Sequence, residues 1–544
     1  MSQLAEHGRA LATTVNKAFG AREPWQVATI TASTVLSLVW LWNLLSDNES
    51  VYSKGRKTFF RLLRKVPYVR DKIKAEVDKL REDFEADVTK SVQGVDYVVS
   101  LPPQGLKRED ILRKLEDHLN LGHYNWKGGQ VSGAVYYYDP ELIQLVTEVY
   151  GKASYTNPLH ADIFPGICKM EAEVVKMTAD LFSGDTNVCG TMTTGGTESI
   201  VLACKAYRDY ARDVKGITKP NIVAPTTAHA AFDKAGQYFG IHLNYVKVNP
   251  KTTEVDISAM EGAINRNTIL LVGSAPNFPY GTLDDIEGIA KLGQKYNIPV
   301  HVDACLGGFV IAFMKKAGYY VRPFDFSVKG VTSISADTHK YGFAPKGSSV
   351  ILYSDKIYRH YQYTVTTEWP GGVYGSPTIN GSRAGGIIAA CWATLLNFGQ
   401  DGYIEATKKI IETTKYIEKS LRKVKGIHIY GNPATSVIAI GSEEFDIFRL
   451  SDILCGLGWN LNALQFPSGI HLCVTHIHTM DGVADKFIGD VQGAAQELLR
   501  SPKGKVEGKM AIYGVAQSVP DRTLVGDFTR CFIDSMYFVP SKKQ

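Results

Sequence analysis

Three short segments of the chain carry residue types that could do chemistry. The first, residues 190–199, reads GTMTTGGTES and stands before a helical pattern. Its glycines would let backbone N–H groups approach an anion, and the N-terminus of the following helix favours negative charge. Thr197 could add a hydroxyl. No lysine follows the glycines, so the segment is not a nucleoside-triphosphate loop, and by itself it indicates either an anion site or a structural turn.

The second segment, residues 298–308, reads IPVHVDACLGG and predicts a buried strand that ends at Asp303. A buried carboxylate is costly unless it meets a cation or hydrogen-bond donors. Asp303 is therefore either a residue that pairs with a positively charged group or the N-cap of the next helix.

The third segment, residues 331–342, reads VTSISADTHKYG and places His339 and Lys340 just past another strand. A lysine there is either an ordinary surface cation or a desolvated amine with the lowered pKa that imine chemistry requires. His229 ends the sequence APTTAH after a further strand and is either a helix cap or an aromatic ring available for stacking.

The elements around these segments alternate between helix and strand from about residue 170. We expect helices at 171–182, 198–213, 229–240 and 284–296, and strands at 221–224, 268–273, 300–303, 331–335 and 348–353. This alternation predicts a mostly parallel sheet covered by helices on both faces. Open sheets of this kind bind ligands at the carboxyl ends of their strands, where all three segments would meet. After residue 399 we expect a long helix, 403–424, and a smaller α+β region.

Composition excludes several classes of protein. A chain of 544 residues with 44% hydrophobic and 21% charged residues is neither a small disulfide scaffold nor disordered. The eight cysteines are scattered and no C-x-x-C occurs, which favours free thiols in a reducing compartment. Seven basic residues and no acidic ones lie within 51–70, and the rest of the chain holds 53 basic and 55 acidic residues. A nearly neutral body gives no indication of nucleic-acid binding.

The N-terminal region predicts attachment to a membrane. No charged residue lies between Glu23 and Asp47, and the apolar stretch 27–45 approaches the ~20 residues that span a bilayer, although a buried core helix is the alternative. The basic residues after this stretch place the bulk of the chain on the cytosolic side and the short N-terminus on the other side. Residues 70–90 have helical spacing and would connect the membrane to the body.

In combination the three segments are far more specific than any one of them. A Gly/Thr turn, a strand-end aspartate and, 37 residues later, a His-Lys pair occur in the order found in pyridoxal-phosphate (PLP) enzymes of fold type I. The chain resembles one family closely, the sphingosine-1-phosphate lyases, within the PLP-dependent group II decarboxylase-like superfamily. The resemblance rests on residues 157–166, 193–198, 301–308, 333–342 and 374–383.

The resemblance implies a PLP-dependent transferase-like α/β fold with four parts. These are a short N-terminus and transmembrane helix (1–50), a basic juxtamembrane segment and N-terminal helical region (51–150), a large PLP-binding domain (151–400) and a small C-terminal α+β domain (401–544). Lys340 would form an imine with the cofactor aldehyde, and Asp303 would keep the pyridine nitrogen protonated, so that the ring becomes an electron sink. His229 would stack on the ring, and Gly196, Thr197 and His339 would complete the cofactor site.

The implied activity is retro-aldol cleavage of the C2–C3 bond of a phosphorylated long-chain sphingoid base, giving a long-chain aldehyde and phosphoethanolamine. Asn157, His160 and Lys346 would hold the substrate phosphate, with Tyr136 near the reacting hydroxyl as a fourth catalytic residue beside Lys340, Asp303 and His229. Surface contacts for Lys346 and core packing for Tyr136 are the alternatives.

The resemblance also implies a homodimer, with residues 371–386 reaching the partner's site, and a single-pass location in the endoplasmic reticulum membrane with the catalytic part in the cytosol. Two other functions stay open: an amino-acid decarboxylase, which would need a cation for the substrate carboxylate, and a membrane-tethered scaffold without activity. The presence of both Lys340 and Asp303 argues against the scaffold. A metal site is not expected, because His471, Cys473, His476 and His478 fit a strand with a polar face better than a metal cluster.

Overall fold

The computed structural model describes residues 2–45, 51–504, 506, 519 and 521–539. Its contacts divide the chain into two compact units, Met1–Glu76 and Val77–Gln544. The four-part division expected from the sequence stays a prediction, and residues 46–50, which close its first part, lie outside the described residues.

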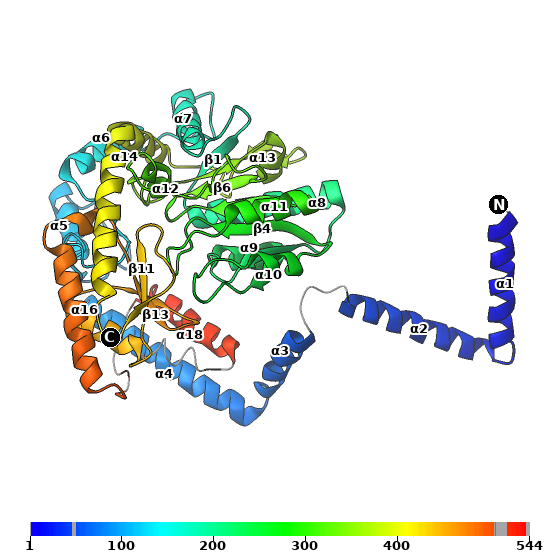
Figure 1. The fold of residues 1–544 in the computed structure, drawn as a ribbon. Helices are drawn as coiled ribbons and strands as arrows, with labels where there is room; N and C mark the ends of the chain where they lie inside the picture. Colours follow the sequence, from blue (N-terminus) through cyan, green and yellow to red (C-terminus); the bar gives the residue numbers. More distant parts are fainter. Residues whose placement is uncertain (1, 46–50, 505, 507–518, 520, 540–544) are drawn as a thin grey trace. The chain divides into compact units, whose positions relative to one another are not determined.

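The larger unit contains a seven-stranded sheet of order β1-β7-β6-β5-β4-β2-β3 (Figure 1). The pairs β3–β2, β2–β4, β4–β5 and β5–β6 are parallel, whereas β7 is antiparallel to both β6 and β1. β1 therefore runs in the same direction as β6, and the prediction of a mostly parallel sheet is confirmed. The strands are β1 (Cys189–Thr193), β2 (Asn221–Pro225), β3 (His242–Val246), β4 (Thr268–Ser274), β5 (Val300–Asp303), β6 (Ser333–Ala336) and β7 (Ser349–Tyr353).

Helices cover both faces of this sheet, because successive side chains of a buried strand point to opposite sides. On β2, Ile222 and Ala224 pack into one apolar core with α8 and α9, whereas Val223 packs into a second core with α7, α11 and α12. The helices are α7 (Pro165–Leu181), α8 (Gly196–Lys215), α9 (Ala231–Phe239), α10 (Ile257–Ala263), α11 (Ile286–Tyr296), α12 (Gly308–Met314) and α13 (Lys356–Gln362).

The C-terminal region follows a long helix, α14 (Gly385–Leu421), which is kinked at Gly399. A second, antiparallel sheet of order β10-β11-β13-β12 follows, with α15 (Ile447–Gly456), α16 (Val483–Arg500) and α18 (Arg522–Ser535). Its strands are β10 (His428–Ile429), β11 (Val437–Gly441), β12 (Asn462–Leu464) and β13 (Gly469–Cys473). β13 ends at Cys473, and His476 and His478 lie in the 3₁₀ turn His476–Thr479, so the prediction of one strand through all four residues is wrong beyond Cys473.

Four helices lie near the N-terminus: α1 (Ser2–Phe19), α2 (Pro24–Leu45), α3 (Val51–Leu63) and α4 (Pro67–Ser91). Among the residues described, none of the helices combines the length and apolarity that crossing a bilayer requires. The structure therefore does not show the transmembrane helix expected at 27–45. The helix expected at 70–90 corresponds to α4. Two further helices, α5 (Arg108–Leu119) and α6 (Pro140–Ala153), precede the large sheet, and a small hairpin, β8 (Thr364–Thr366) with β9 (Tyr374–Ser376), follows it.

Candidate active site

The topology brings the three predicted segments to one edge of the large sheet. Asp303 ends β5, and His339 and Lys340 follow the end of the adjacent parallel strand β6. β1 points in the same direction as β6, so the turn at Thr194 and Gly195 leaves the sheet at the same edge. His229 follows β2, which is parallel to β4 and through it to β5. The carboxyl edge therefore holds every residue expected to contact the cofactor ring.

Lys340 lies against a carboxylate that the sequence analysis did not single out. Its Nζ is 2.8 Å from Oδ2 of Asp337, which is itself buried. Burial alone would lower the pKa of Lys340, but the negative charge of Asp337, reinforced by Cys305 and Asp303, outweighs it and raises that pKa above the usual value. The sequence left open either an ordinary cation or a desolvated amine with a lowered pKa; in this arrangement the pKa is raised, which favours the ammonium form of Lys340.

Asp303 is buried and its position is fixed by both backbone and neighbouring side chains. Its Oδ1 accepts a hydrogen bond from the Cys305 N–H at 3.1 Å, so it does cap the following turn. On the same face of β5, His301 lies between two serine hydroxyls of β6, Ser333 Oγ at 2.8 Å and Ser335 Oγ at 3.1 Å. Burial lowers the pKa of His301 to about 4, so this ring is neutral at physiological pH. The network holds β5 and β6 in register beneath Asp303 and Lys340.

The turn between β1 and α8 has the features of an anion cradle. The N-cap residue of α8, Gly195, provides no side-chain hydrogen bond, so the N–H groups of the first turn are free to bind a ligand. Before it, the N–H and the hydroxyl of Thr194 both donate to Oε2 of Glu198, at 2.7 and 2.6 Å, which fixes the turn. Thr197 is exposed in the first helical turn. These groups suit the phosphate of PLP.

Gly196 and His339 complete the wall of this site. A Cβ atom at Gly196 would lie 2.7 Å from both Asp337 Oδ1 and Cys305 Sγ, so only glycine fits there. His339 accepts a hydrogen bond from the Ser348 N–H at its Nδ1 (3.1 Å), which leaves the proton of the neutral ring on Nε2, 3.6 Å from Asp337 Oδ2. Burial lowers the pKa of His339, which favours this neutral form.

Lys346 lies against Tyr136 and against the backbone just before Lys340. The Lys346 Nζ lies 4.8 Å from the centre of the Tyr136 ring and 3.4 Å from the carbonyl oxygen of His339. Although its side chain is exposed, partial burial of the ammonium and the positive charge of Lys340 lower the pKa of Lys346. Tyr136 is buried edge-to-face against Tyr341, with ring centres 4.8 Å apart. Tyr136 therefore packs in the core and also contacts Lys346.

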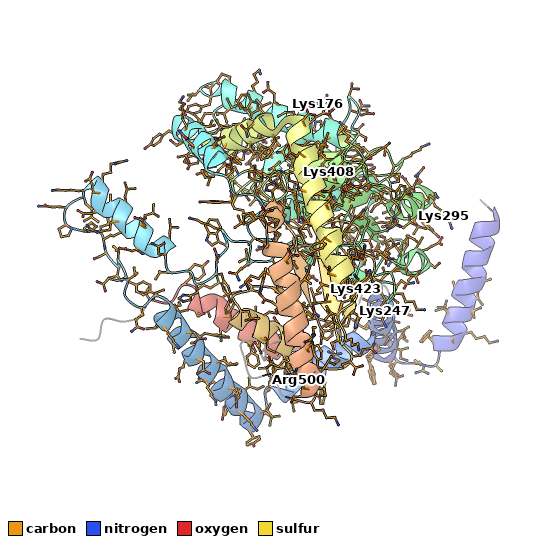
Figure 2. The ribbon with its side chains drawn as sticks, turned by 60° about the vertical axis from the view of Figure 1, so that its left-hand side comes forward. Lys176, Lys247, Lys295, Lys408, Lys423 and Arg500 are labelled. Atoms are coloured by element: carbon orange, nitrogen blue, oxygen red, sulfur yellow. The ribbon has the colours of Figure 1, made fainter. Side chains whose placement is uncertain are left out.

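The location of Lys346 differs from that of the cations on the outer surface. Figure 2 shows labelled basic side chains spread over separate elements around the molecule, all of them exposed: Lys176, Lys247, Lys295, Lys408, Lys423 and Arg500. Lys340 is half-buried at the sheet edge, and the Lys346 ammonium is directed towards an aromatic ring of the site.

The other expected residues have local structural roles in the single chain. The Asn157 Oδ1 accepts hydrogen bonds from the N–H groups of Leu159 and Arg383, both at 3.1 Å, and so joins its loop to residues 371–386. His160 is exposed, and no contact in the described part of the chain links it to Lys346. His229 is also exposed, and its Nδ1 accepts a hydrogen bond from the Ala231 N–H at 3.1 Å, at the start of α9. This contact corresponds to the helix cap, one of the two roles that the sequence left open for His229.

Sequence reasoning missed Asp337 and Tyr341. The signal for Asp337 was present, because it directly follows a buried strand, as Asp303 ends one. The Tyr341 hydroxyl lies 2.6 Å from the carbonyl oxygen of Val474, to which it donates, and 2.5 Å from Ser436 Oγ, so it ties the site to the C-terminal sheet.

A cavity of about 670 Å³ between α7, α12 and α14 is lined by none of the candidate residues. Within the described residues no group of His, Cys, Asp and Glu side chains is arranged to hold a metal ion.

Comparisons with known proteins give a consistent result. Residues 96–440 match the family described as the pyridoxal-dependent decarboxylase conserved domain. The chain is 66% identical over 529 residues to the sphingosine-1-phosphate lyase of Drosophila melanogaster, covering 97% of each chain. It is 50% identical over 516 residues to sphingosine-1-phosphate lyase 1 of Rattus norvegicus, covering 95% of this chain and 90% of that one.

Solved structures agree with these sequence relatives. The sphingosine-1-phosphate lyase of Burkholderia pseudomallei superposes with a TM-score of 0.73 at 39% identity, covering 75% of this chain and 95% of that chain. The glutamate decarboxylase of Lactobacillus brevis superposes with a TM-score of 0.64 at 23% identity, covering 75% and 96% of the two chains, and shows only that the fold is shared.

Proposed function

Since this chain belongs to the sphingosine-1-phosphate lyase family of PLP-dependent enzymes, we propose how its own residues divide the work of that reaction. The protein is a PLP-dependent carbon–carbon lyase that cleaves the C2–C3 bond of phosphorylated long-chain bases, giving a long-chain aldehyde and phosphoethanolamine. When bound, PLP supplies an electron sink for the bond that breaks.

We assign the cofactor to the carboxyl edge of the large sheet. Lys340 would carry the cofactor aldehyde, and Asp303 would face the pyridine nitrogen. The first turn of α8, with Gly196 and Thr197, would bind the phosphate, and His229 and His339 would line the ring. What supports this assignment is that Asp303 and Lys340 follow adjacent parallel strands and that Gly196 leaves no space for a side chain.

The observation that carries the substrate assignment is the placement of Lys346 beside Lys340. Burial first, and then repulsion by the nearby Lys340 charge, lower the pKa of Lys346, and a substrate phosphate would stabilise its ammonium against both effects. Tyr136, under the Lys346 ammonium, can orient the reacting hydroxyl with its own hydroxyl group. Asn157 and His160 would contribute their amide nitrogen and ring nitrogens to the same phosphate. A fixed phosphate would align C2–C3 with the electron sink.

The test is direct. The purified full-length protein, loaded with PLP, is incubated with a phosphorylated long-chain base, with the same base lacking phosphate, and with a panel of amino acids. We expect the aldehyde and phosphoethanolamine in equal amounts from the first substrate and much less aldehyde from the second. Carbon dioxide release from an amino acid without aldehyde formation would instead establish the decarboxylase alternative.

We further propose that two copies of the chain form the working enzyme. An apolar surface, defined here as Tyr155, Ile163, Trp369, Val373 and Ile379, is exposed in the single chain, with exposed fractions of 98, 63, 55, 79 and 59%. These residues lie on two segments that Asn157 and the Arg383 N–H join. Large apolar side chains exposed on segments that are joined in this way are candidates for an interface, and a second copy is the occupant that the family resemblance implies. Light scattering should give twice the chain mass, and Val373→Asp should shift it towards the single-chain mass.

Attachment to the endoplasmic reticulum membrane, as a single pass with the catalytic part in the cytosol, is a separate proposal. It rests on the uncharged stretch between Glu23 and Asp47 and on the basic residues at 51–70. A protein lacking residues 1–60 should lose sedimentation with microsomal membranes and keep its activity, because every candidate site residue follows residue 130. Unchanged sedimentation would contradict the proposed anchor. Protease digestion of intact microsomes should remove the C-terminal bulk, and its protection would contradict the orientation.

A further inference from the structure

Asp337 is a buried carboxylate whose partners all belong to the active site. Its exposed fraction is 2%, its Oδ2 lies 2.8 Å from Lys340 Nζ and 3.6 Å from His339 Nε2, and its Oδ1 is buried without a hydrogen bond. The unbonded oxygen points at Gly196, where a Cβ would lie 2.7 Å away. Asp337 therefore borders both the reactive amine and the anion cradle.

Two other buried carboxylates of the described chain, Asp284 and Asp209, are satisfied by several donors. Asp284 accepts backbone N–H groups at both oxygens, from Val255 at 2.9 Å and Ser274 at 2.8 Å. Asp209 is paired with three cations of α8. Asp337 lacks such support, and an oxygen buried without a donor costs free energy. The charge of Asp337 is balanced chiefly by Lys340, so removing either residue should leave the other without its main partner.

This arrangement matters because Lys340 changes its state during turnover. On the function proposed above, Lys340 would hold the cofactor through its amine and would be released when the substrate amine takes that place. The Lys340 Nζ contacts the Asp337 carboxylate, and the charge of that carboxylate outweighs burial and favours the ammonium form of an amine that is not bonded to the cofactor. An ammonium has no lone pair, so it cannot attack the cofactor until it gives up a proton.

We propose that Asp337 is a positioning residue that receives the displaced Lys340 as an ammonium, keeps it next to its point of attachment, and stabilises the protonated nitrogen when Lys340 carries the cofactor. The carboxylate contacts the nitrogen of Lys340 and needs no contact with substrate. Its removal should therefore change the protonation of Lys340 and the rate of turnover more than the binding of substrate.

The first test uses the PLP-loaded enzyme and the isosteric variant Asp337→Asn. A carboxylate beside a protonated nitrogen raises its pKa by roughly 1–3 units. The absorbance titration of the cofactor joined to Lys340 should therefore shift to lower pH by about one unit or more, kcat should fall, and KM should change little. The matched control is Asp209→Asn, a buried acid on α8 that touches no site residue, whose titration should equal that of the unmodified protein. An unshifted titration in Asp337→Asn would overturn the proposal.

The second test is a double-mutant cycle in thermal unfolding, which needs no activity. Lys340→Ala leaves the Asp337 charge without its partner and should lower the Tm. Adding Asp337→Asn to Lys340→Ala should raise the Tm again, whereas Asp337→Asn alone should lower it. If Asp337→Asn lowers the Tm equally in both backgrounds, Asp337 serves the fold and the proposal is wrong. The outcome is separate from the proposed function, because a protein that shows the cycle but forms no aldehyde would refute only the latter.

Discussion

Replacing Lys346 with methionine removes its ammonium and keeps an unbranched stem against the Tyr136 ring. An ammonium bound to a phosphate contributes roughly 1.5–3 kcal/mol. Because the Lys346 side chain is exposed and solvent weakens such pairs, we expect the lower part of this range, about 1.5–2 kcal/mol. At 1.4 kcal/mol per tenfold, kcat/KM for the phosphorylated base should fall by about 10- to 30-fold.

The assay compares kcat/KM on the phosphorylated base and on the same base without phosphate, with bound PLP measured in each preparation. Lys346→Met should lose the preference for phosphate and keep its PLP. The matched control is Lys423→Met, which removes an exposed cation elsewhere on the surface and should leave both values unchanged (Figure 2). An equal loss on both substrates would refute the reasoning and place Lys346 with the cofactor or the fold.

The pH dependence of the same preference follows from the pKa of Lys346. Burial of its ammonium and the charge of Lys340 lower that pKa below the usual value for lysine, so Lys346 loses its charge at a lower pH than an ordinary lysine. The preference for the phosphorylated substrate should therefore be complete near neutral pH and decline on the alkaline side, before ordinary lysines titrate. A preference that persists until ordinary lysines titrate would contradict the assigned role.

Three further substitutions test the cofactor site. Lys340→Ala should abolish turnover and the absorbance of protein-bound PLP while the circular dichroism stays native-like, and a retained band would rule out Lys340 as the attachment point. Asp303→Asn should keep PLP bound and lose most of its kcat, since an amide cannot hold the pyridine nitrogen protonated; near-normal turnover would leave Asp303 as a cap only. Gly196→Ala places a Cβ 2.7 Å from Asp337 and Cys305, so it should lower the unfolding free energy by about 1–3 kcal/mol and weaken PLP binding, and unchanged PLP affinity would contradict the close approach.

The parts of the site that sequence reasoning anticipated are those fixed by strand ends. Asp303 and Lys340 follow apolar runs that could only be buried strands, and the parallel arrangement then places them at one edge. Lys346 was also predictable, since the short turn after Lys340 can only bring the chain back to the same cavity. At these positions the local sequence pattern is enough to predict which residues meet in the folded chain.

The parts that were not anticipated depend on which side chains meet across the fold. A pKa of Lys340 lowered by burial was one of the two alternatives that the sequence left open, but the Asp337 carboxylate reverses the direction of that shift, and no spacing rule reports that contact. The Asn157 oxygen is occupied by the Arg383 N–H, more than two hundred residues away. The strand expected through His478 ends at Cys473 because the chain turns into a 3₁₀ helix, which apolar alternation does not reveal.

The Tyr341 hydroxyl, which contacts Val474 and Ser436, has a consequence for how the protein is made. Tyr341 is therefore anchored by residues that flank β11 and β13 and that leave the ribosome 95 and 133 residues later. A nascent chain that ends before residue 474 has the large sheet and the reactive lysine but lacks the carbonyl oxygen to which the Tyr341 hydroxyl donates. Stable uptake of PLP should therefore begin only after residue 474 has been synthesised.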